Sequence, residues 1–160
     1  MRFAICLFML HQKITEDLKT AMKAGKEFEV GVLRFLLSSL HNKEIEKKSK
    51  GLEPTLSDEE IIEILSREAK KRKEAIEMYT EGGRNDLVEK EEKELEIIKQ
   101  YLPEQLSEEE IEKIVVATIE KIGVKDIKAL GRVMGEVMKE LKGKADASLV
   151  SEIVKKRLSL

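Results

Sequence analysis

The residues that could act as nucleophiles or general bases are few in this chain. It has one cysteine, Cys6, and two histidines, His11 and His41. A catalytic Ser, Cys or Thr needs a neighbouring base, most often a histidine. His11 follows an apolar run at the start of the chain, and His41 lies in a polar segment near an expected helix end. Neither setting is typical of a catalytic triad, so the residues predict no catalytic site.

The chain also lacks the residue patterns that usually bind metals and cofactors. One cysteine and two histidines form no cluster with zinc-ligand spacing. The chain has no phosphate-binding Gly-x-x-x-x-Gly-Lys-Ser/Thr loop and no dinucleotide-binding glycine motif. We therefore expect no metal and no cofactor. The unpaired cysteine favours a reducing compartment, and we predict a cytoplasmic protein.

Positive charge near the C-terminus is the clearest candidate for a binding site. The chain has 30 basic and 32 acidic residues, a net charge of −2, which excludes a globally basic protein that coats nucleic acid. Residues 121–160, however, carry ten basic and five acidic residues and no aromatic residue. Such a patch can bind a phosphate backbone, and without aromatic rings it would recognise shape and phosphates. The candidate RNA contacts are Lys128, Arg132, Lys139, Lys142, Gly143 and Lys144. The alternative is that these residues only form solvated helix faces and bind no ligand.

Two glycines, Gly131 and Gly135, lie four residues apart in the same segment. Each glycine inside a helix costs about 0.5 to 1 kcal/mol relative to alanine. Close approach of another backbone is a structural explanation for them, and close approach of a ligand or RNA backbone is a functional one. Packing is the explanation favoured by the sequence.

The elements that position these residues are predicted to be helices. The chain has nine Gly, two Pro and no Trp, and it is rich in helix-favouring residues. We expect an all-α protein. Apolar residues at helical spacing predict N-terminal helices over 14–24, 29–48 and 57–81, and a return helix ending near 102. Ser57 and Glu60 form a predicted capping box. The Gly82-Gly83 turn implies a long antiparallel hairpin.

A cationic residue interrupts the inner apolar positions of the long helix. These positions are Ile62, Leu65, Ala69, Ile76 and Tyr79, and Arg72 lies midway between Ala69 and Ile76. We expect Arg72 to pair with Glu91 or Glu94 across the hairpin. The neighbouring basic residues alternate with glutamates, which favours ion pairs within the helix.

The chain is predicted to have two domains. Residues 103–106 interrupt the helical pattern and form an expected linker between an N-terminal helical domain, 1–102, and a C-terminal module, 107–160. Ser107 and Glu110 form a second capping box. Three amphipathic segments then predict a small three-helix bundle, with Gly123 ending its first helix and Asp146 capping its last.

Residues 1–12 are expected to be an N-terminal extension. Arg2 precedes eight apolar residues, but a helix of eight residues is about 12 Å long and cannot cross a hydrocarbon core of about 30 Å. No small-residue cleavage site follows, so we expect neither a membrane anchor nor a cleaved signal. The extension would pack on the domain with Cys6 as a small buried apolar residue, or it reflects a start codon assigned too early.

Four spaced motifs together carry a family resemblance over residues 13–160. They are Gly82-Gly83-Arg84-Asn85-Asp86-Leu87, Tyr101-Leu102-Pro103-Glu104-Gln105-Leu106-Ser107, Gly131-Arg132-Val133-Met134-Gly135-Glu136-Val137-Met138 and Lys142-Gly143-Lys144-Ala145-Asp146. Their combination resembles the GatB/YqeY family in its small, stand-alone YqeY-like form.

The resemblance implies a helical protein whose C-terminal module is similar to the tail domain of the B subunit of the glutamine-dependent tRNA amidotransferase. In that enzyme the tail helps to hold tRNA. The positions carried over are Gly131, Gly135, Lys142, Gly143 and Lys144. The large catalytic domain of that subunit has no counterpart in residues 1–106, so a carbon–nitrogen ligase label would come only from the shared tail.

Three functions follow from these observations. The first is a tRNA-binding or amidotransferase-associated helical adaptor. The second is a protein–protein interaction module with no RNA role, which would dock through the charged N-terminal hairpin. The third is an accessory role in a carbon–nitrogen ligase that uses glutamine as amide donor, with a partner supplying the catalytic groups. The expected partners are therefore tRNA, amidotransferase subunits or another protein, and no membrane.

Overall fold

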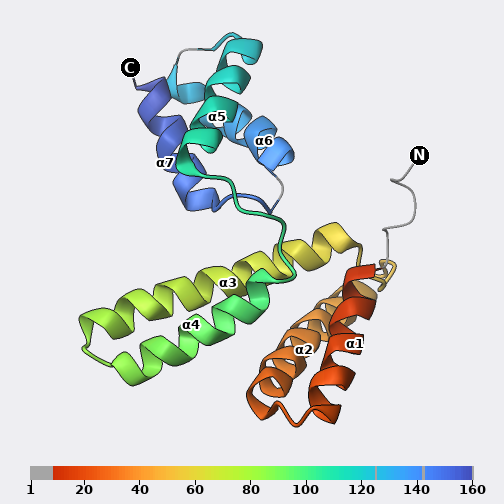
Figure 1. Cartoon of the computed structure of the whole chain (residues 1–160). Helices are drawn as coiled ribbons and strands as arrows, with labels where there is room; N and C mark the ends of the chain where they lie inside the picture. The colour runs from red at the N-terminus through yellow and green to blue at the C-terminus, as the bar shows by residue number, and fades with distance from the viewer. Residues whose placement is uncertain (1–8, 125, 142, 160) are drawn as a thin grey trace. The chain divides into compact units, whose positions relative to one another are not determined.

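The protein is described by a computed structural model that covers residues 9–124, 126–141 and 143–159 (Figure 1). Its elements are α1 (Met9–Lys23), α2 (Glu27–Ser49), α3 (Asp58–Glu81), α4 (Asn85–Lys99), α5 (Glu108–Ile122), the short 3-10 helix η1 (Ile127–Ala129), α6 (Leu130–Leu141) and α7 (Ala147–Leu158). These described residues contain no strand, and the all-α prediction is confirmed. The chain divides into two compact units, a first ending at Leu102 and a second beginning at Pro103.

The first unit consists of two helical hairpins (Figure 1). Gly25, at φ +67°, connects α1 to α2, and Gly83, at φ +66°, connects α3 to α4, because a glycine adopts this left-handed conformation without strain. The fully buried side chains of the core come from all four helices: Ile14, Leu33, Leu36, Leu40, Ile61, Leu65 and Ile98. In α3 the buried position is Ile61, whereas the predicted inner residue Ile62 is only partly buried.

Both predicted capping boxes are confirmed. At the start of α3, the Glu60 amide donates to Ser57 Oγ over 3.2 Å, and the Ser57 amide donates to Glu60 Oε2 over 2.9 Å. The same exchange joins Ser107 and Glu110 at the start of α5. The Ser57 amide, with the ammonium of Lys47, lowers the pKa of Glu60 below its usual range. The first amides of both helices are therefore satisfied by local side chains.

Tyr101 connects the end of the second hairpin to α1. Its hydroxyl donates to Asp17 Oδ2 over 2.7 Å, and its side chain is buried. The ammonium of Lys13 lies 5.4 Å from the centre of its ring. Burial, with the Asp17 carboxylate, raises the pKa of Tyr101 well above its usual value near 10.

Replacing Tyr101 by Phe should lower the free energy of unfolding by about 1 kcal/mol at pH 7, because one buried hydrogen bond is lost. A raised pKa contributes stability below about pH 10 that is lost as the pH rises toward the folded-state value. The wild-type advantage should therefore shrink at pH 10.5 in urea titrations. Tyr79→Phe is the control, because the Tyr79 hydroxyl makes no hydrogen bond among the described residues. Equal stability of Tyr101→Phe and wild type at pH 7 would contradict this prediction.

The second unit is a three-helix bundle of α5, α6 and α7. Its fully buried side chains include Val115, Val133, Val137, Leu141, Val150 and Val154. Gly123, at φ +72°, ends α5, and the Asp146 carboxylate accepts the Ser148 amide at the start of α7, as predicted. Arg157 of α7 pairs with Glu112 of α5 over 2.6 Å. The bundle therefore combines an aliphatic core with a surface ion pair between α5 and α7.

The predicted N-terminal extension lies mainly outside the described residues, which include neither Cys6 nor the rest of residues 1–8. Residues 9–12 form the first turn of α1, where Leu10 packs against the core of the first unit. Across the part of the chain that the structure describes, no helix combines the length and the apolar content needed to cross a membrane.

Candidate nucleic-acid interface

The predicted basic residues lie on one face of α6 and of the short helix before it. Val133, Val137 and Leu141 point into the core and are fully buried. At about 100° per residue, the candidate contacts fall within an arc of about 100° on the opposite side of the helix. We define the basic face of α6 as Lys128, Gly131, Arg132, Gly135 and Lys139, all of which are exposed.

The loop after α6 is held by the segment expected to be a linker. The Gln105 side-chain amide donates to the Gly143 carbonyl over 2.7 Å, and the Leu106 amide donates to the Lys144 carbonyl over 2.8 Å. Gly143 adopts φ +71°, which favours glycine. The structure thus fixes the exposed Lys144 just beyond the end of α6. Lys142, also predicted to contact RNA, lies outside the described residues.

The basic face carries one ion pair of its own. Lys139 Nζ lies 2.7 Å from Glu136 Oε1, and both side chains are exposed. This lysine lowers the pKa of the Glu136 carboxyl, with smaller contributions from Lys121 and Arg132. An exposed pair of this kind contributes little to stability. Breaking this pair so that Lys139 contacts a phosphate would therefore cost little free energy.

Within the second unit, the excess of positive charge is confined to residues 121–160. Residues 103–160 contain eleven basic and eleven acidic residues, because residues 103–120 carry six acids and one base. The unit as a whole is neutral, so any anion-binding surface must be the patch itself. The acidic residues of 103–120 therefore balance the positive charge of residues 121–160, which the sequence analysis did not foresee.

Packing of α5 on α6 adds Lys121 to this region. Lys121 and Thr118 of α5, with Arg132, Glu136 and Glu140 of α6, line a hollow of about 250 Å³. Lys121 was not among the predicted contacts, since nothing in the sequence shows that the end of α5 lies beside α6. The hollow contains two cations and two carboxylates, a balance that does not favour an anion inside it.

Neither glycine of α6 is explained by packing. A Cβ atom built on Gly131 or Gly135 meets no atom within 4 Å. The packing explanation favoured by the sequence is therefore wrong for the described residues, because no other backbone approaches this face. Approach of a ligand from outside is the explanation that stays open.

Gly131→Ala and Gly135→Ala should each raise the free energy of unfolding of the second unit by about 0.5 to 1 kcal/mol, because alanine favours the helix and its Cβ meets no neighbour. Chemical denaturation monitored by circular dichroism would measure this. Gly123→Ala is the control and should destabilise the unit, since Gly123 has φ +72°. Destabilisation by Gly135→Ala would show that the glycine has a structural role.

A second cluster of charged residues lies in the first unit around Arg72. Its Nε lies 2.8 Å from Glu94 and 3.3 Å from Glu91, so the predicted pairing across the hairpin is confirmed with both glutamates. A third carboxylate, Glu68, lies 3.6 Å from Arg72 and is buried. Lys71 contacts one Glu68 oxygen over 2.7 Å, whereas the other accepts no hydrogen bond within the described chain.

The burial of Glu68 was missed by the sequence analysis, which treated this glutamate as part of a solvated ion-pair series. Its only signal was its position four residues before Arg72. No group of three or more metal-ligating side chains is suitably placed among the residues that the structure describes. In this cluster the guanidinium of Arg72 lies between the three carboxylates, and Lys71 and Lys90 add single contacts to Glu68 and Glu94.

These features define a class of all-helical protein with two small units and an exposed, glycine-containing basic helix face. A family model described as "Yqey-like protein" matches residues 11–158. The chain therefore belongs to the YqeY-like family, and the resemblance inferred from its motifs is confirmed.

Several curated fungal proteins are similar to this chain. An uncharacterized protein of Schizosaccharomyces pombe is 35% identical over 98 residues, which cover 61% of this chain and 76% of that protein. "Altered inheritance of mitochondria protein 41, mitochondrial" of Pyrenophora tritici-repentis is 30% identical over 144 residues, 88% of this chain and 76% of the relative. The protein of the same name from Lachancea thermotolerans is 39% identical over 89 residues, 56% of this chain. The match spans 46% of that relative, about half its length.

The predicted cytoplasmic location is wrong in view of these relatives, several of which have names that place them in mitochondria. The prediction used the unpaired cysteine as a sign of reducing conditions, and such conditions are not confined to the cytosol. None of these names refers to tRNA or to an amidotransferase.

Proposed function

We propose that this chain is a helical adaptor that binds tRNA through the basic face of α6 and the loop that follows it. The observation that carries the proposal is the position of Gly131 and Gly135 among three cations on an exposed face where packing gives no reason for glycine. A helix without side chains at two positions lets a phosphate backbone approach closely, while Lys128, Arg132 and Lys139 supply charge on either side.

The loop after α6 extends this surface. Lys144 follows the end of the helix, and the hydrogen bonds from Gln105 and Leu106 hold its backbone in place before any ligand binds. A preorganised loop loses less conformational entropy on binding than a free one. Because residues 121–160 contain no aromatic ring, we propose recognition of RNA shape and phosphates instead of base stacking.

The test is a titration of the full chain with bulk tRNA at 50 and 200 mM salt, with duplex DNA as competitor. Four phosphate contacts imply a loss of affinity of about 50- to 150-fold over this range, because each contact releases counterions. Preference for tRNA over the duplex would support recognition of folded RNA. A salt-insensitive complex, or no binding at 50 mM salt, would contradict the proposal.

Association with an amidotransferase extends the same proposal. In a complex, the chain would hold tRNA while a partner supplied the carbon–nitrogen ligase activity with glutamine as amide donor. The names of the fungal relatives further suggest that this takes place in mitochondria. An amide product that depends on both the partner and this chain would support the accessory role, and full activity of the partner alone would contradict it.

A protein-binding role is the second candidate function, and it rests on a different part of the chain. The first unit exposes aromatic side chains beside a charged hairpin. Binding of a protein by this unit in the absence of RNA would favour this candidate.

A further inference from the structure

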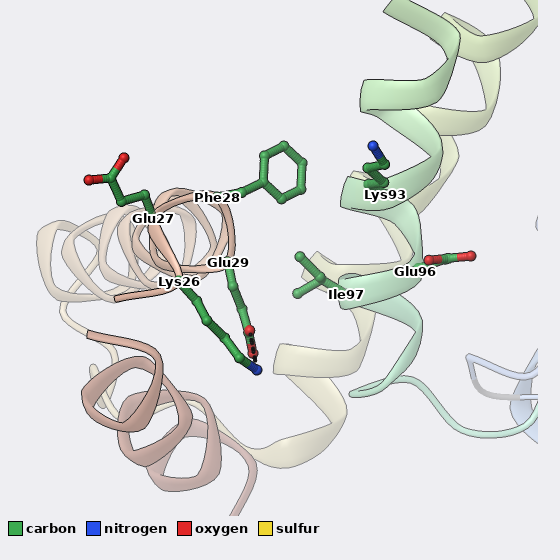
Figure 2. Close-up of a pocket in the computed structure, with 7 residues that line it drawn as sticks. All are labelled: Lys26, Glu27, Phe28, Glu29, Lys93, Glu96 and Ile97. Carbon is green, nitrogen blue, oxygen red and sulfur yellow. Dashed lines mark ion pairs between the residues drawn. The ribbon is translucent and has the colours of Figure 1, made fainter. Parts of the chain in front are cut away.

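The hollow between α5 and α6 differs from a hollow of the first unit in how its charges are paired. Between α2 and α4, Lys26 Nζ lies 3.0 Å from Glu29 Oε2, so a cation that lines this hollow pairs with a neighbouring carboxylate (Figure 2). Between α5 and α6, Lys121 and Arg132 form no ion pair among the described residues, although two glutamates line the same hollow. Both cations therefore remain available to an anion from solution.

Three cations from two helices act on the carboxylate of Glu136, which lines this hollow. Its Oε1 lies 2.7 Å from Lys139 Nζ. Lys139, then Lys121 and Arg132, lower the pKa of the carboxyl below its usual range. Because a phosphate oxygen accepts the same charge-assisted hydrogen bonds as a carboxylate oxygen, the position of this carboxylate also suits a phosphate.

Glu136 decides whether the hollow is neutral or positive. The lining contains two cations, Lys121 and Arg132, and two carboxylates, Glu136 and Glu140. If Glu136 turned away, one carboxylate would face two cations. The Glu136 side chain is 51% exposed, and its surface ion pair with Lys139 contributes little to stability. This side chain can therefore move into solvent when a phosphate takes its place.

Thr118 adds a neutral hydrogen-bond donor to the lining of the hollow. The residue is only 6% exposed. Its hydroxyl makes no hydrogen bond among the described residues, whereas most buried polar groups in proteins are hydrogen-bonded. A hydroxyl can donate to a phosphate oxygen, so a phosphate in the hollow would satisfy Thr118 as well as the cations.

We propose that the hollow between α5 and α6 is a phosphate-binding position for tRNA that the Glu136 carboxylate occupies in the free protein. A phosphate of the bound RNA displaces Glu136, contacts Lys121, Arg132 and Lys139, and accepts a hydrogen bond from Thr118. Lys121 thereby extends the basic face of α6 onto α5, and Glu136 lowers the affinity of this interface for phosphates. This inference rests on the proposed tRNA function and adds a competing residue to the same site.

The main test measures tRNA binding by the full chain with Glu136→Gln at several salt concentrations. Glutamine keeps the size of the side chain and removes its charge. The variant should bind tRNA about three- to fivefold more tightly at about 0.1 M salt, the effect of one unit charge about 4 Å away in water. The slope of log affinity against log salt should steepen by about 0.7 to 0.9, the value of one phosphate contact. Unchanged affinity would overturn the proposal.

Control variants separate a defined position from a general effect of charge. Glu140→Gln removes the same charge from the same hollow, but Glu140 forms no ion pair among the described residues, so the affinity should rise less than about 1.5-fold. Adding Lys121→Gln to Glu136→Gln should abolish the gain, whereas adding Lys113→Gln, elsewhere on α5, should preserve most of it. Equal gains for the two glutamate variants, or a gain that survives the loss of Lys121, would overturn the proposal.

Inorganic pyrophosphate is a probe of the hollow that does not depend on tRNA. Titrated into the full, isotope-labelled chain, it should shift the amide signals of residues 118–121 and 132–139, and it should bind Glu136→Gln about three- to fivefold more tightly than the wild type. Equal binding by the two proteins would overturn the proposal. A gain with pyrophosphate, but no tRNA binding by either protein, would support the phosphate position and contradict the tRNA function. Binding of tRNA by the wild type, with no gain in the variant, would have the opposite meaning.

Discussion

Replacing Lys128, Arg132 and Lys139 together by glutamine should lower the affinity for tRNA about a hundredfold near 0.1 M salt. Each lost phosphate contact removes about 0.7 to 0.9 from the slope of log affinity against log salt, so the triple variant should lose about 2 to 3 units of slope. The three side chains are exposed and support no buried contact, so the fold should be unaffected. Filter binding or fluorescence anisotropy at several salt concentrations would measure both quantities.

The matched control removes the same charge from another part of the second unit. Lys113 lies on α5, and Lys155 and Lys156 lie on α7, all exposed and outside the basic face. The triple replacement of these lysines by glutamine should change affinity and slope much less. Equal losses of affinity in the two variants would show that tRNA binding depends only on net charge. That result would contradict a defined interface on α6.

Replacing Arg72 by alanine should lower the free energy of unfolding by about 3 to 5 kcal/mol, the range observed when one partner of a buried ion pair is removed. Glu68, Glu91 and Glu94 would be left without their shared cation, and their side chains are only 7, 17 and 15% exposed. The variant also loses the contact between the guanidinium and the Phe35 ring. Urea denaturation of the full chain at pH 7 would measure the change.

Arg67, five residues earlier on α3, provides the control for this prediction. It pairs with Glu63, but both side chains are more than 60% exposed. Arg67→Ala should therefore change the free energy of unfolding by less than about 1 kcal/mol. Similar effects for Arg67→Ala and Arg72→Ala would contradict the special role of the Arg72 cluster.

The sequence predicted those parts of the fold that depend on local signals. The capping boxes at Ser57 and Ser107 formed as expected because both partners lie within one helical turn. The pairing of Arg72 was predictable because a cation on an inner helix position needs a carboxylate opposite it. These features require only helical periodicity and a short connection between antiparallel neighbours.

Features that depend on three-dimensional packing were not predictable in the same way. Gly131 and Gly135 were expected to allow close approach of another backbone, but the open side of α6 is defined only once α5 and α7 occupy the other sides. The hydrogen bond from Gln105 to Gly143 in the loop after α6 joins residues 38 positions apart. The position of Lys121 beside Arg132 likewise depends on how α5 packs against α6.

The short connections between successive helices have a consequence for the order of folding. Each hairpin pairs helices that are adjacent in the chain, and such local contacts favour folding on the microsecond to millisecond scale. The two hairpins of the first unit can each form as they leave the ribosome. The hydrogen bond from Tyr101 to Asp17, which spans 84 positions, becomes available only when synthesis has passed the end of α4. During translation this bond can therefore form only after both hairpins of the first unit have been made.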